Sequence, residues 1–450
     1  MSHFGQSVVA KLRGRGVGVE LAKGAGGSFV LMVVSAGIAF GTNVVLARVL
    51  GVTEYGMYIY ALEWINLLAW ACQLGLVTSL VRFVSAYNAQ GEWGLFRGIL
   101  SRSIQYVLLA TLVIGIVAAC VMWLLFERIG AQQTVTLWIA LLILPLIALT
   151  GLRQGALRGL KRVVIASVPD SIVRPLLIAI MVVLWYSLAQ QPLQAPAAMV
   201  INLVAALVAF GLGSMFLVKC LPERVRHAAS LYAGWEWLKV SLPMFFGSGM
   251  FLILRQADVL MVGVIMGPAQ AGIYAVVSRI TELVSFGTHA IDSIAAPMIS
   301  ELHSTKKLRA LQRMATFAAR GTFAFSFVMS VLLALVGTYV LALFGEEFVV
   351  GYDAMQILLV GVVIKSLFGS AGFLLSMTGY HTQGAVIAGA CAALNIALNA
   401  TLIPTYGLTG AAVATAVSNV FWSIIVLIYV MHRVEINPTI FARIKAEATG

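Results

Sequence analysis

A small set of ionisable side chains lies within or at the edge of long apolar stretches of this sequence. Even on the mildest insertion scale, a charge at the centre of a bilayer costs about 2.5–3.5 kcal/mol, so each such residue is a candidate for function. Cations can hold phosphate or carboxylate groups, and carboxylates or imidazoles can exchange protons. The set consists of Glu63, Asp170, Arg174, Arg255, Asp258, Arg279, Glu282, His289, Asp292 and Lys365, with Arg48 just inside one helix end.

Two polar stripes in the sequence correspond to each other. The first falls within an arc of roughly 80° on one helix and extends about 15 Å along it. Adding 216 to each residue number of the first stripe gives the second stripe. Asp292 extends the second stripe by one helical turn. We expect both stripes to line a cleft, and buried contacts within one half are the alternative. The stripes are Glu63, Asn66, Trp70 and Gln73, and then Arg279, Glu282, Phe286 and His289.

Four cations could give this cleft a cationic lining: Arg48, Arg255, Arg279 and Lys365. A cation at low dielectric attracts phosphate far more strongly than it does in water, and Arg adds bidentate geometry. The expected substrate therefore carries phosphate or carboxylate. The residue types indicate no catalytic or metal site, because the sequence has no P-loop, nucleophile elbow or metal-ligand cluster.

Opposite charges are also spaced for local pairing. Asp170 and Arg174 are four residues apart, while Arg255 with Asp258 and Arg279 with Glu282 are three apart, close enough for each pair to neutralise itself. Glu63 and Arg279 are equivalent positions of opposite charge. We expect these two to approach each other across the cleft and to help close an outer gate.

A duplicated motif explains why the stripes correspond. Gly51, Gly56 and Tyr58 recur as Gly267, Gly272 and Tyr274 in a G-x4-G-x-Y pattern 216 residues further on. Each copy lies between two long apolar stretches. The sequence therefore predicts two homologous halves, related by an axis along the membrane normal and rocking about a central site.

The composition is that of a membrane protein. Hydrophobic residues make up 61% and charged residues 10%, with a mean hydropathy of +0.98, whereas charged residues are near a quarter of a soluble domain. A spanning helix needs about 20 apolar residues. Twelve such helices are expected, at 28–49, 57–80, 104–126, 135–152, 168–188, 197–218, 242–266, 272–298, 321–344, 354–378, 385–403 and 410–431.

These spans define the expected organisation of an all-α polytopic protein. The ranges are a cytoplasmic N-terminal segment at 1–27, an N-lobe at 28–218, a cytoplasmic linker at 219–241, a C-lobe at 242–431 and a cytoplasmic tail at 432–450. Alternate loops collect most of the Lys and Arg residues, which places them and both termini in the cytoplasm. The net charge of +12 is then a topology signal and a contact surface for membrane lipids, and no nucleic-acid partner is expected. The four cysteines predict no disulfide.

Several runs resemble a known family. The first run is 47–51, which leads to 55–58, and the second is Gly75-Leu76 before Arg82-Phe83. The third is 395–412. In it, Asn395-x3-Asn399 precedes Ile403-Pro404-x-Tyr406-Gly407. The chain resembles the polysaccharide or oligosaccharide (O-antigen-type) flippases of the multidrug/oligosaccharidyl-lipid/polysaccharide exporter superfamily. The resemblance covers all twelve spans.

The resemblance implies a V of two six-helix lobes and alternating access in a bacterial inner membrane. The implied activity is flipping of a polyprenyl-pyrophosphate-linked glycan for cell-surface polysaccharide such as lipopolysaccharide or exopolysaccharide, with no cofactor and no enzymatic step. A proton or sodium gradient would drive it, and polysaccharide polymerase and glycosyltransferases are implied partners. The coupling candidates are Glu63, Asp258, Glu282, His289 and Asp292.

Two alternatives stay open at this stage. An ion-coupled multidrug exporter of the same superfamily would share the fold, but a cationic lining weighs against cationic drugs. A non-transporting scaffold of a glycan-synthesis complex would not need polar stripes in register in both halves.

Overall fold

The computed structural model describes residues 15–125, 130–189 and 191–442, and over these ranges the chain is helical with no strand. The predicted terminal segments at 1–27 and 432–450 lie partly outside these residues. The first half contains α2 (Arg15–Gln73), α3 (Leu76–Gln90), α4 (Trp93–Leu124), α5 (Ala131–Gly159), α6 (Val163–Val168), the π-helix η1 (Pro169–Val173), α7 (Arg174–Leu188) and α8 (Ala195–Cys220).

A short helix, α9 (Glu223–His227), lies on the connection to the second half. That half contains α10 (Gly234–Met266), α11 (Pro268–Glu282), α12 (Ser285–Ser304), α13 (Leu308–Ala342), the 3-10 helix η2 (Glu346–Gly351), α14 (Tyr352–Leu367), α15 (Ala371–Met377) and α16 (His381–Arg433). Each of the twelve expected spans falls on one or more of these helices.

Within the described residues, nine helices are long and apolar enough to cross a membrane. The number is below twelve because some spans are joined and others are broken. The chain turns at Gly51 inside α2 and at Gly407 inside α16, both with positive φ, so each of these elements contains two spans or most of them. The eighth span is divided into α11 and α12. The chain is a multi-pass membrane protein.

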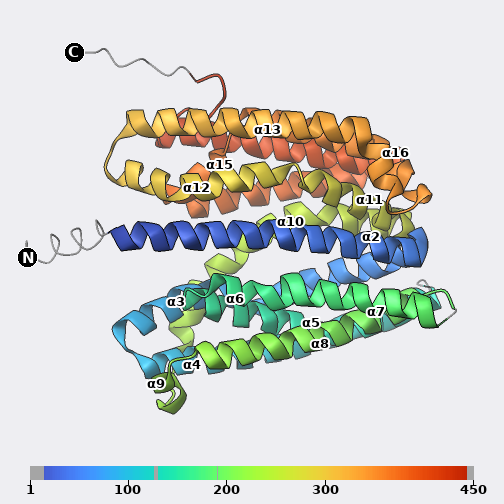
Figure 1. The fold of residues 1–450 in the computed structure, drawn as a ribbon, viewed down its shortest axis with the longest axis horizontal. Helices are drawn as coiled ribbons and strands as arrows, with labels where there is room; N and C mark the ends of the chain where they lie inside the picture. The colour runs from blue at the N-terminus through green and yellow to red at the C-terminus, as the bar shows by residue number, and fades with distance from the viewer. Residues whose placement is uncertain (1–14, 126–129, 190, 443–450) are drawn as a thin grey trace, which may run out of the picture.

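The helices form two bundles, with α3 to α8 in the lower one and α11 to α16 in the upper one (Figure 1). Helix α2 runs between them and contacts α5 and α7 on one side and α11 on the other. Helix α10 packs mainly on α16 and also reaches α2 and α3. We call α2 to α8 the N-lobe and α10 to α16 the C-lobe.

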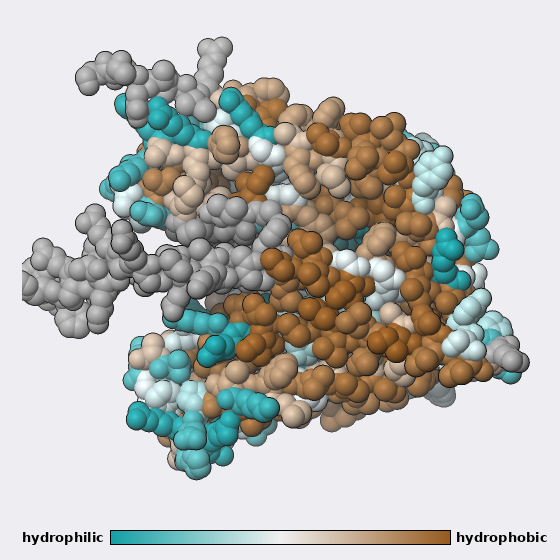
Figure 2. All heavy atoms as spheres, in the orientation of Figure 1, coloured by the Kyte–Doolittle hydropathy of each residue, from teal (hydrophilic) through white to brown (hydrophobic). Residues whose placement is uncertain are grey.

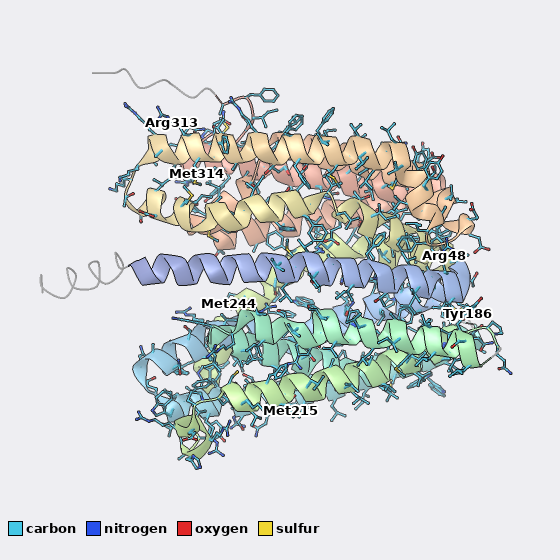
Figure 3. The ribbon with its side chains drawn as sticks, in the orientation of Figure 1. Arg48, Tyr186, Met215, Met244, Arg313 and Met314 are labelled. Atoms are coloured by element: carbon cyan, nitrogen blue, oxygen red, sulfur yellow. The ribbon has the colours of Figure 1, made fainter. Side chains whose placement is uncertain are left out.

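The surface has the polarity of a membrane-spanning protein. Apolar residues cover the middle of the molecule and hydrophilic residues gather toward its two ends (Figure 2). Arg48 and Tyr186 lie toward one end, and Arg313 lies toward the other (Figure 3). We refer to these as the Arg48 end and the Arg313 end. Helix α2 begins at the Arg313 end.

Candidate inter-lobe site

The second glycines of the duplicated motif meet where the lobes touch. A Cβ atom on Gly272 would lie 2.7 Å from the Cα of Gly56, and one on Gly56 would lie 2.2 Å from the carbonyl oxygen of Pro268. Any larger side chain would separate the helices, because real Cβ contacts are longer. Two equivalent residues, 216 positions apart, therefore form one close crossing between α2 and α11.

The other residues of the duplicated motif have separate structural roles. Gly51 and Gly267 adopt φ values of 73° and 98°, a region that favours glycine, and each lies where one helical segment ends and the next begins. Tyr58 and Tyr274 are buried. The motif thus turns the chain, allows the two copies to touch and sends an aromatic side chain inward.

Beside this crossing, Arg279 on α11 contacts three residues of α2. Its Nη1 donates hydrogen bonds to Asn43 Oδ1 and, at 3.2 Å, to the hydroxyl of Tyr55. Its Nη2 lies 3.8 Å from Glu63 Oε1, and the side chains of Arg279 and Glu63 are 33% and 13% exposed. The pair that the repeat offset suggested is therefore an ion pair between the lobes.

A further contact joins the lobes at the Arg48 end. Arg48 donates from Nε to the carbonyl of Leu343 at 2.6 Å and from Nη2 to that of Ala342 at 3.2 Å. The amide of Val52 donates to Glu347 at 3.3 Å. Each lobe thus supplies a charged side chain to a helix end of the other, where free carbonyls favour cations and free amides favour anions. In this conformation the guanidinium of Arg48, which the sequence placed with the cleft cations, is held at the end of α13.

A second ion pair is exposed in the middle of the spanning region. Arg255 on α10 bonds to Glu282 on α11, and their side chains are 69% and 49% exposed. Lys365 on α14 is exposed too, with its ammonium 5.6 Å from the ring centre of Trp422. Charged side chains are too costly to leave in hydrocarbon. The surface they share must therefore contact water or a polar ligand.

This surface is not purely cationic, which corrects the expected lining. Arg255 is paired with Glu282, and Arg279 with Glu63. Lys365 is within electrostatic range of Asp292 on α12. Each of the three cations thus has a carboxylate near it, and an anionic ligand would have to compete for them.

The predicted local pairs do not form in α10 and α11. Arg255 takes Glu282 as its partner, and Arg279 takes Glu63. Asp258 points into the C-lobe and is only 4% exposed. Residues three apart on a helix do lie on neighbouring parts of its surface, but here partners on other helices offer closer contacts.

Asp258 lies in a buried polar cluster inside the C-lobe. One carboxylate oxygen accepts from Asn399 Nδ2 at 3.2 Å, and the other accepts from the hydroxyl of Thr415. Asn399 also donates to Asn395 at 3.0 Å, and the hydroxyl of Tyr274 lies 3.0 Å from that of Thr415. Among the described residues, Asp258 has no cationic partner within ion-pair distance.

The N-lobe holds buried cations instead. Arg153 on α5 forms an ion pair with Asp170, and their side chains are 4% and 16% exposed. Gln154 donates to the same carboxylate at 3.0 Å. Arg174 donates to Asn202 from two nitrogens, at 3.0 and 2.8 Å. The expected pair of Asp170 with Arg174 does not form, because each residue has a partner on another helix.

The first polar stripe is divided between two surroundings. Trp70 donates to Ser248 at 3.2 Å and stacks on Phe245, with ring centres 4.2 Å apart, so it contacts the opposite lobe through α10. Gln73 instead donates to the carbonyl of Ala148 at 3.5 Å, within the N-lobe. At Gln73 the alternative of a contact within one half is therefore correct.

The remaining predicted site residues differ in exposure. Asn66, Phe286 and Asp292 are partly buried, while His289 is exposed. One oxygen of Asp292, Oδ1, is buried with no hydrogen-bond partner among the described residues. Phe286, His289 and Asp292 lie on α12, and Asn66 lies on α2.

Sequence reasoning missed several partners. Asn43 and Tyr55 bind Arg279, and Trp422 faces Lys365. Asn395 and Asn399 carry the family resemblance in the sequence, but their role as partners of Asp258 is visible only in the structure. Two amides four residues apart in an apolar helix lie on one face, and this spacing could have identified the Asp258 cluster.

Comparisons with known proteins agree on the family. The family model described as "Polysaccharide biosynthesis protein" matches residues 21–303. A relative named "Probable flippase AglR", from Haloferax volcanii, is 28% identical over 243 residues, or 52% of this chain. The match covers 48% of that relative, so the chain spans about half its length.

Solved structures share the fold. An inward-facing multidrug resistance MATE family transporter of the MOP superfamily has a TM-score of 0.71 at 13% identity, with 89% of this chain and 94% of that chain covered. The lipid II flippase MurJ, in an inward closed conformation, has a TM-score of 0.70 at 16% identity, with 89% and 86% covered. The chain belongs to the polysaccharide biosynthesis protein family.

Proposed function

We propose that this protein flips a polyprenyl-pyrophosphate-linked oligosaccharide from the cytoplasmic to the outer leaflet of a bacterial inner membrane by alternating access. The observation that carries the proposal is the exposed Arg255–Glu282 pair at mid-span, combined with closure of the lobes at the Arg48 end by the Gly56–Gly272 crossing. Polar groups are accessible inside the membrane while one entrance is shut. A transporter needs this arrangement, and a passive scaffold does not.

The headgroup would bind by ion-pair exchange. A pyrophosphate carries several acceptor oxygens and more charge than one carboxylate, so it can replace Glu282 on Arg255 and bind bidentately. Lys365, which is exposed on the same surface, adds a second cation. Because each cation already has a carboxylate near it, loss of the substrate would restore the internal pairs rather than leave bare charges.

The contacts around Arg279 would form the outer gate. In the present conformation Arg279 holds Asn43, Tyr55 and Glu63 of the other lobe. Opening toward the outer leaflet must break these bonds, so a closing contact elsewhere between the lobes must replace their free energy. The bonds of Trp237 and Ser241 on α10 to Tyr87 and Ser79 of α3 are already formed in the present conformation, so they cannot be that replacement.

Ion coupling would lie at Asp258 rather than at the other predicted carboxylates. Glu63 and Glu282 already face arginines, whereas Asp258 has oxygen ligands around it and, among the described residues, no cation within ion-pair distance. Asn399 Oδ1 is also buried without a hydrogen-bond partner among the described residues, and an unsatisfied buried acceptor costs about 1–3 kcal/mol. A proton or a sodium ion would remove the charge imbalance of this cluster.

The orientation in the membrane is part of the proposal. The Arg313 end would face the cytoplasm, since most of the loop lysines and arginines belong to the loops predicted to lie there. Both termini would then be cytoplasmic. Polysaccharide polymerase and glycosyltransferases, which use the same lipid-linked glycans, would be the partners.

The test is mass spectrometry of polyprenyl-linked glycans in host cells lacking this protein. We expect a pyrophosphate-linked oligosaccharide to accumulate, and wild type to relieve the accumulation. Arg255→Gln should not relieve it. Arg309→Gln, which removes an exposed cation at the start of α13, is the matched control and should behave as wild type. An unchanged lipid pool in cells with no second flippase would contradict the proposal.

Drug export is the second candidate, and the balanced charge of the cleft favours it. Glu63, Glu282 and Asp292 could serve a cationic compound as readily as their partners serve phosphate. Dye efflux from the same cells distinguishes the two. Efflux lost in Glu282→Gln, with an unchanged lipid-linked glycan pool, would indicate a multidrug exporter.

A further inference from the structure

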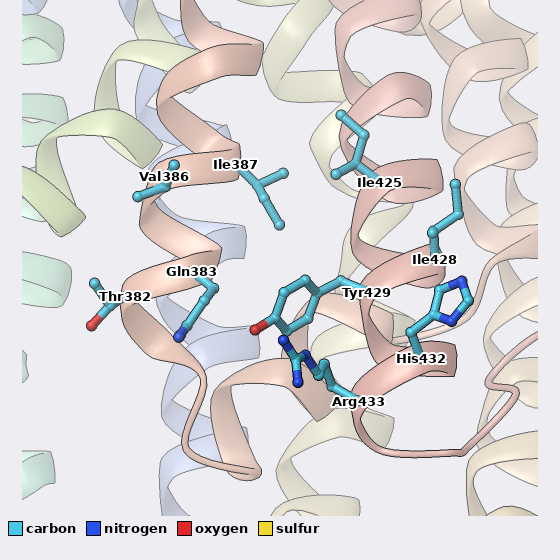
Figure 4. A pocket seen from close by; sticks show the side chains of 9 residues that line it. All are labelled: Thr382, Gln383, Val386, Ile387, Ile425, Ile428, Tyr429, His432 and Arg433. Atoms are coloured by element: carbon cyan, nitrogen blue, oxygen red, sulfur yellow. The ribbon is translucent and has the colours of Figure 1, made fainter.

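A groove lies between the two spanning segments of α16, apart from the inter-lobe site (Figure 4). Its volume is about 470 Å³, which is in the range of small-molecule sites. Val386 and Ile387 line it from the first segment, and Ile425 and Ile428 from the second. The side chains of Val386 and Ile428 are 69% and 52% exposed, so the groove is open to its surroundings.

One end of this groove is polar and cationic. Gln383, Tyr429 and Arg433 converge there from the two segments, with His432 beside them (Figure 4). Arg433 is exposed and has no ion-pair or hydrogen-bond partner among the described residues. An exposed guanidinium at the mouth of an apolar groove is complementary to a phosphate that carries a hydrocarbon chain.

The length of the groove fits one leaflet. From Arg433 to Ile425 the helix rises about 12 Å, and half of a hydrocarbon core is about 15 Å. Arg433 lies near the end of α16, just before the last described residues of the chain. An acyl chain of a phospholipid in that leaflet can therefore extend along the groove while its phosphate remains at the membrane surface.

We propose that this groove binds an anionic glycerophospholipid of the leaflet at the chain-terminus end of α16. The phosphate contacts Arg433, with Tyr429 and Gln383 as further donors, and one acyl chain packs on Val386, Ile387, Ile425 and Ile428. A second apolar groove, between α14 and the second segment of α16, has about 540 Å³ and is lined by Val413, Val417 and other residues, none of them charged. It offers no site for a phosphate and serves as an internal control.

Native mass spectrometry of the full-length protein, titrated with phosphatidylglycerol in detergent, tests the site. We expect Arg433→Gln to weaken the tightest phosphatidylglycerol adduct at least fivefold, and Arg433→Lys to weaken it less. Arg309→Gln removes an exposed cation from another helix and should leave binding unchanged. Ile428→Trp, which fills the groove, should also weaken the adduct, whereas Val417→Trp in the second groove should not.

Three results would overturn the proposal. One is equal phosphatidylglycerol binding by Arg433→Gln and Arg309→Gln. The second is equal affinity for phosphatidylcholine, which would mean that the groove selects only for an acyl chain. The third is unchanged phosphatidylglycerol binding by Ile428→Trp, which would place the tightest adduct outside the groove. All of these readouts are independent of transport.

Discussion

The interiors of the two lobes differ although their scaffold is duplicated. Each lobe buries the tyrosine of one motif copy, Tyr58 or Tyr274. In the C-lobe, Tyr274 joins a cluster around Asp258, a carboxylate with hydrogen bonds but no cation at ion-pair distance in the described part of the chain. In the N-lobe, Tyr58 lies within electrostatic range of Arg174, a cation that donates to Asn202.

The buried carboxylates of the two lobes differ in their partners. The N-lobe pair of Arg153 with Asp170 compensates its own charge. The C-lobe carboxylate lacks such a partner, and a buried charge without one is costly. Buried polar groups therefore have different roles in the two lobes. In the N-lobe a carboxylate and a guanidinium join two elements, and in the C-lobe a carboxylate is held by neutral hydrogen-bond donors.

The same substitution at the two buried carboxylates should give opposite results, and the largest effect is expected at Asp258. Asp258→Asn removes a charge that has no partner, so thermal stability should hold or rise. Gradient-driven transport should fall at least a hundredfold, because the cluster no longer binds a proton or sodium ion. Transport in proteoliposomes, with unfolding temperature measured on the same preparation, checks both. Normal transport by this variant would show that the coupling site is elsewhere.

Asp170→Asn should lower the stability of the protein and leave its transport nearly unchanged. It leaves the Arg153 guanidinium buried without its counter-charge, and breaking such a pair costs about 3–5 kcal/mol. We expect the lower part of this range, because Asp170 is partly exposed. Denaturant unfolding in micelles measures the loss, and transport per folded molecule should change less than twofold. A stable variant that has lost transport would overturn the structural role of the N-lobe pair.

At the contact between the lobes the two halves should behave alike. Gly272→Ala and Gly56→Ala each place a Cβ atom against backbone of the other lobe, so both should open the Arg48 end. Spin labels at Tyr186 and Val350, which are 73% and 71% exposed, report the separation of the lobes by pulsed electron resonance after the natural cysteines are replaced.

The expected outcome is a shift of that distance distribution to longer values in both variants. Gly37→Ala is the matched control, since a Cβ atom there meets nothing within 4 Å. If either motif variant keeps the wild-type distribution, the crossing does not limit opening.

The smallest effect is expected at the reciprocal helix-end contacts. Arg48→Gln weakens two hydrogen bonds to the end of α13, and Glu347→Gln weakens one to Val52. Both side chains are exposed, so we expect about 1 kcal/mol from Arg48 and less from Glu347. The same spin labels should show a roughly fivefold change in the open population for Arg48→Gln. A shift as large as that of Gly272→Ala would mean that Arg48 is the main closing contact.

Hydropathy and the internal repeat were enough to predict the helices. Each of the twelve apolar stretches is helical, because a bilayer leaves few other ways to satisfy the backbone. The turns at Gly51 and Gly407 fall in the expected gaps between spans 28–49 and 57–80 and between spans 385–403 and 410–431. The division of the eighth span into α11 and α12 was not predicted.

The candidate site was less predictable because charged side chains choose partners in three dimensions. The offset between repeats brought Glu63 and Arg279 together correctly, since equivalent positions lie at equal depth. Local spacing failed for Arg255 and Asp258, which face different surfaces of α10. The position of Arg48 along its helix also suggested that it lies with the cleft cations. The free carbonyls at the end of α13 lie nearer to its guanidinium.

Translocation by the purified protein tests the central claim most directly. Proteoliposomes would contain a fluorescent polyprenyl-pyrophosphate oligosaccharide in one leaflet, and quenching would follow its arrival in the other. Wild type should move the lipid, Arg255→Gln should slow it at least tenfold, and Arg309→Gln should match wild type. Equal rates for Arg255→Gln and wild type would contradict pyrophosphate binding at Arg255, and no movement by wild type under a proton or sodium gradient would contradict the flippase function itself.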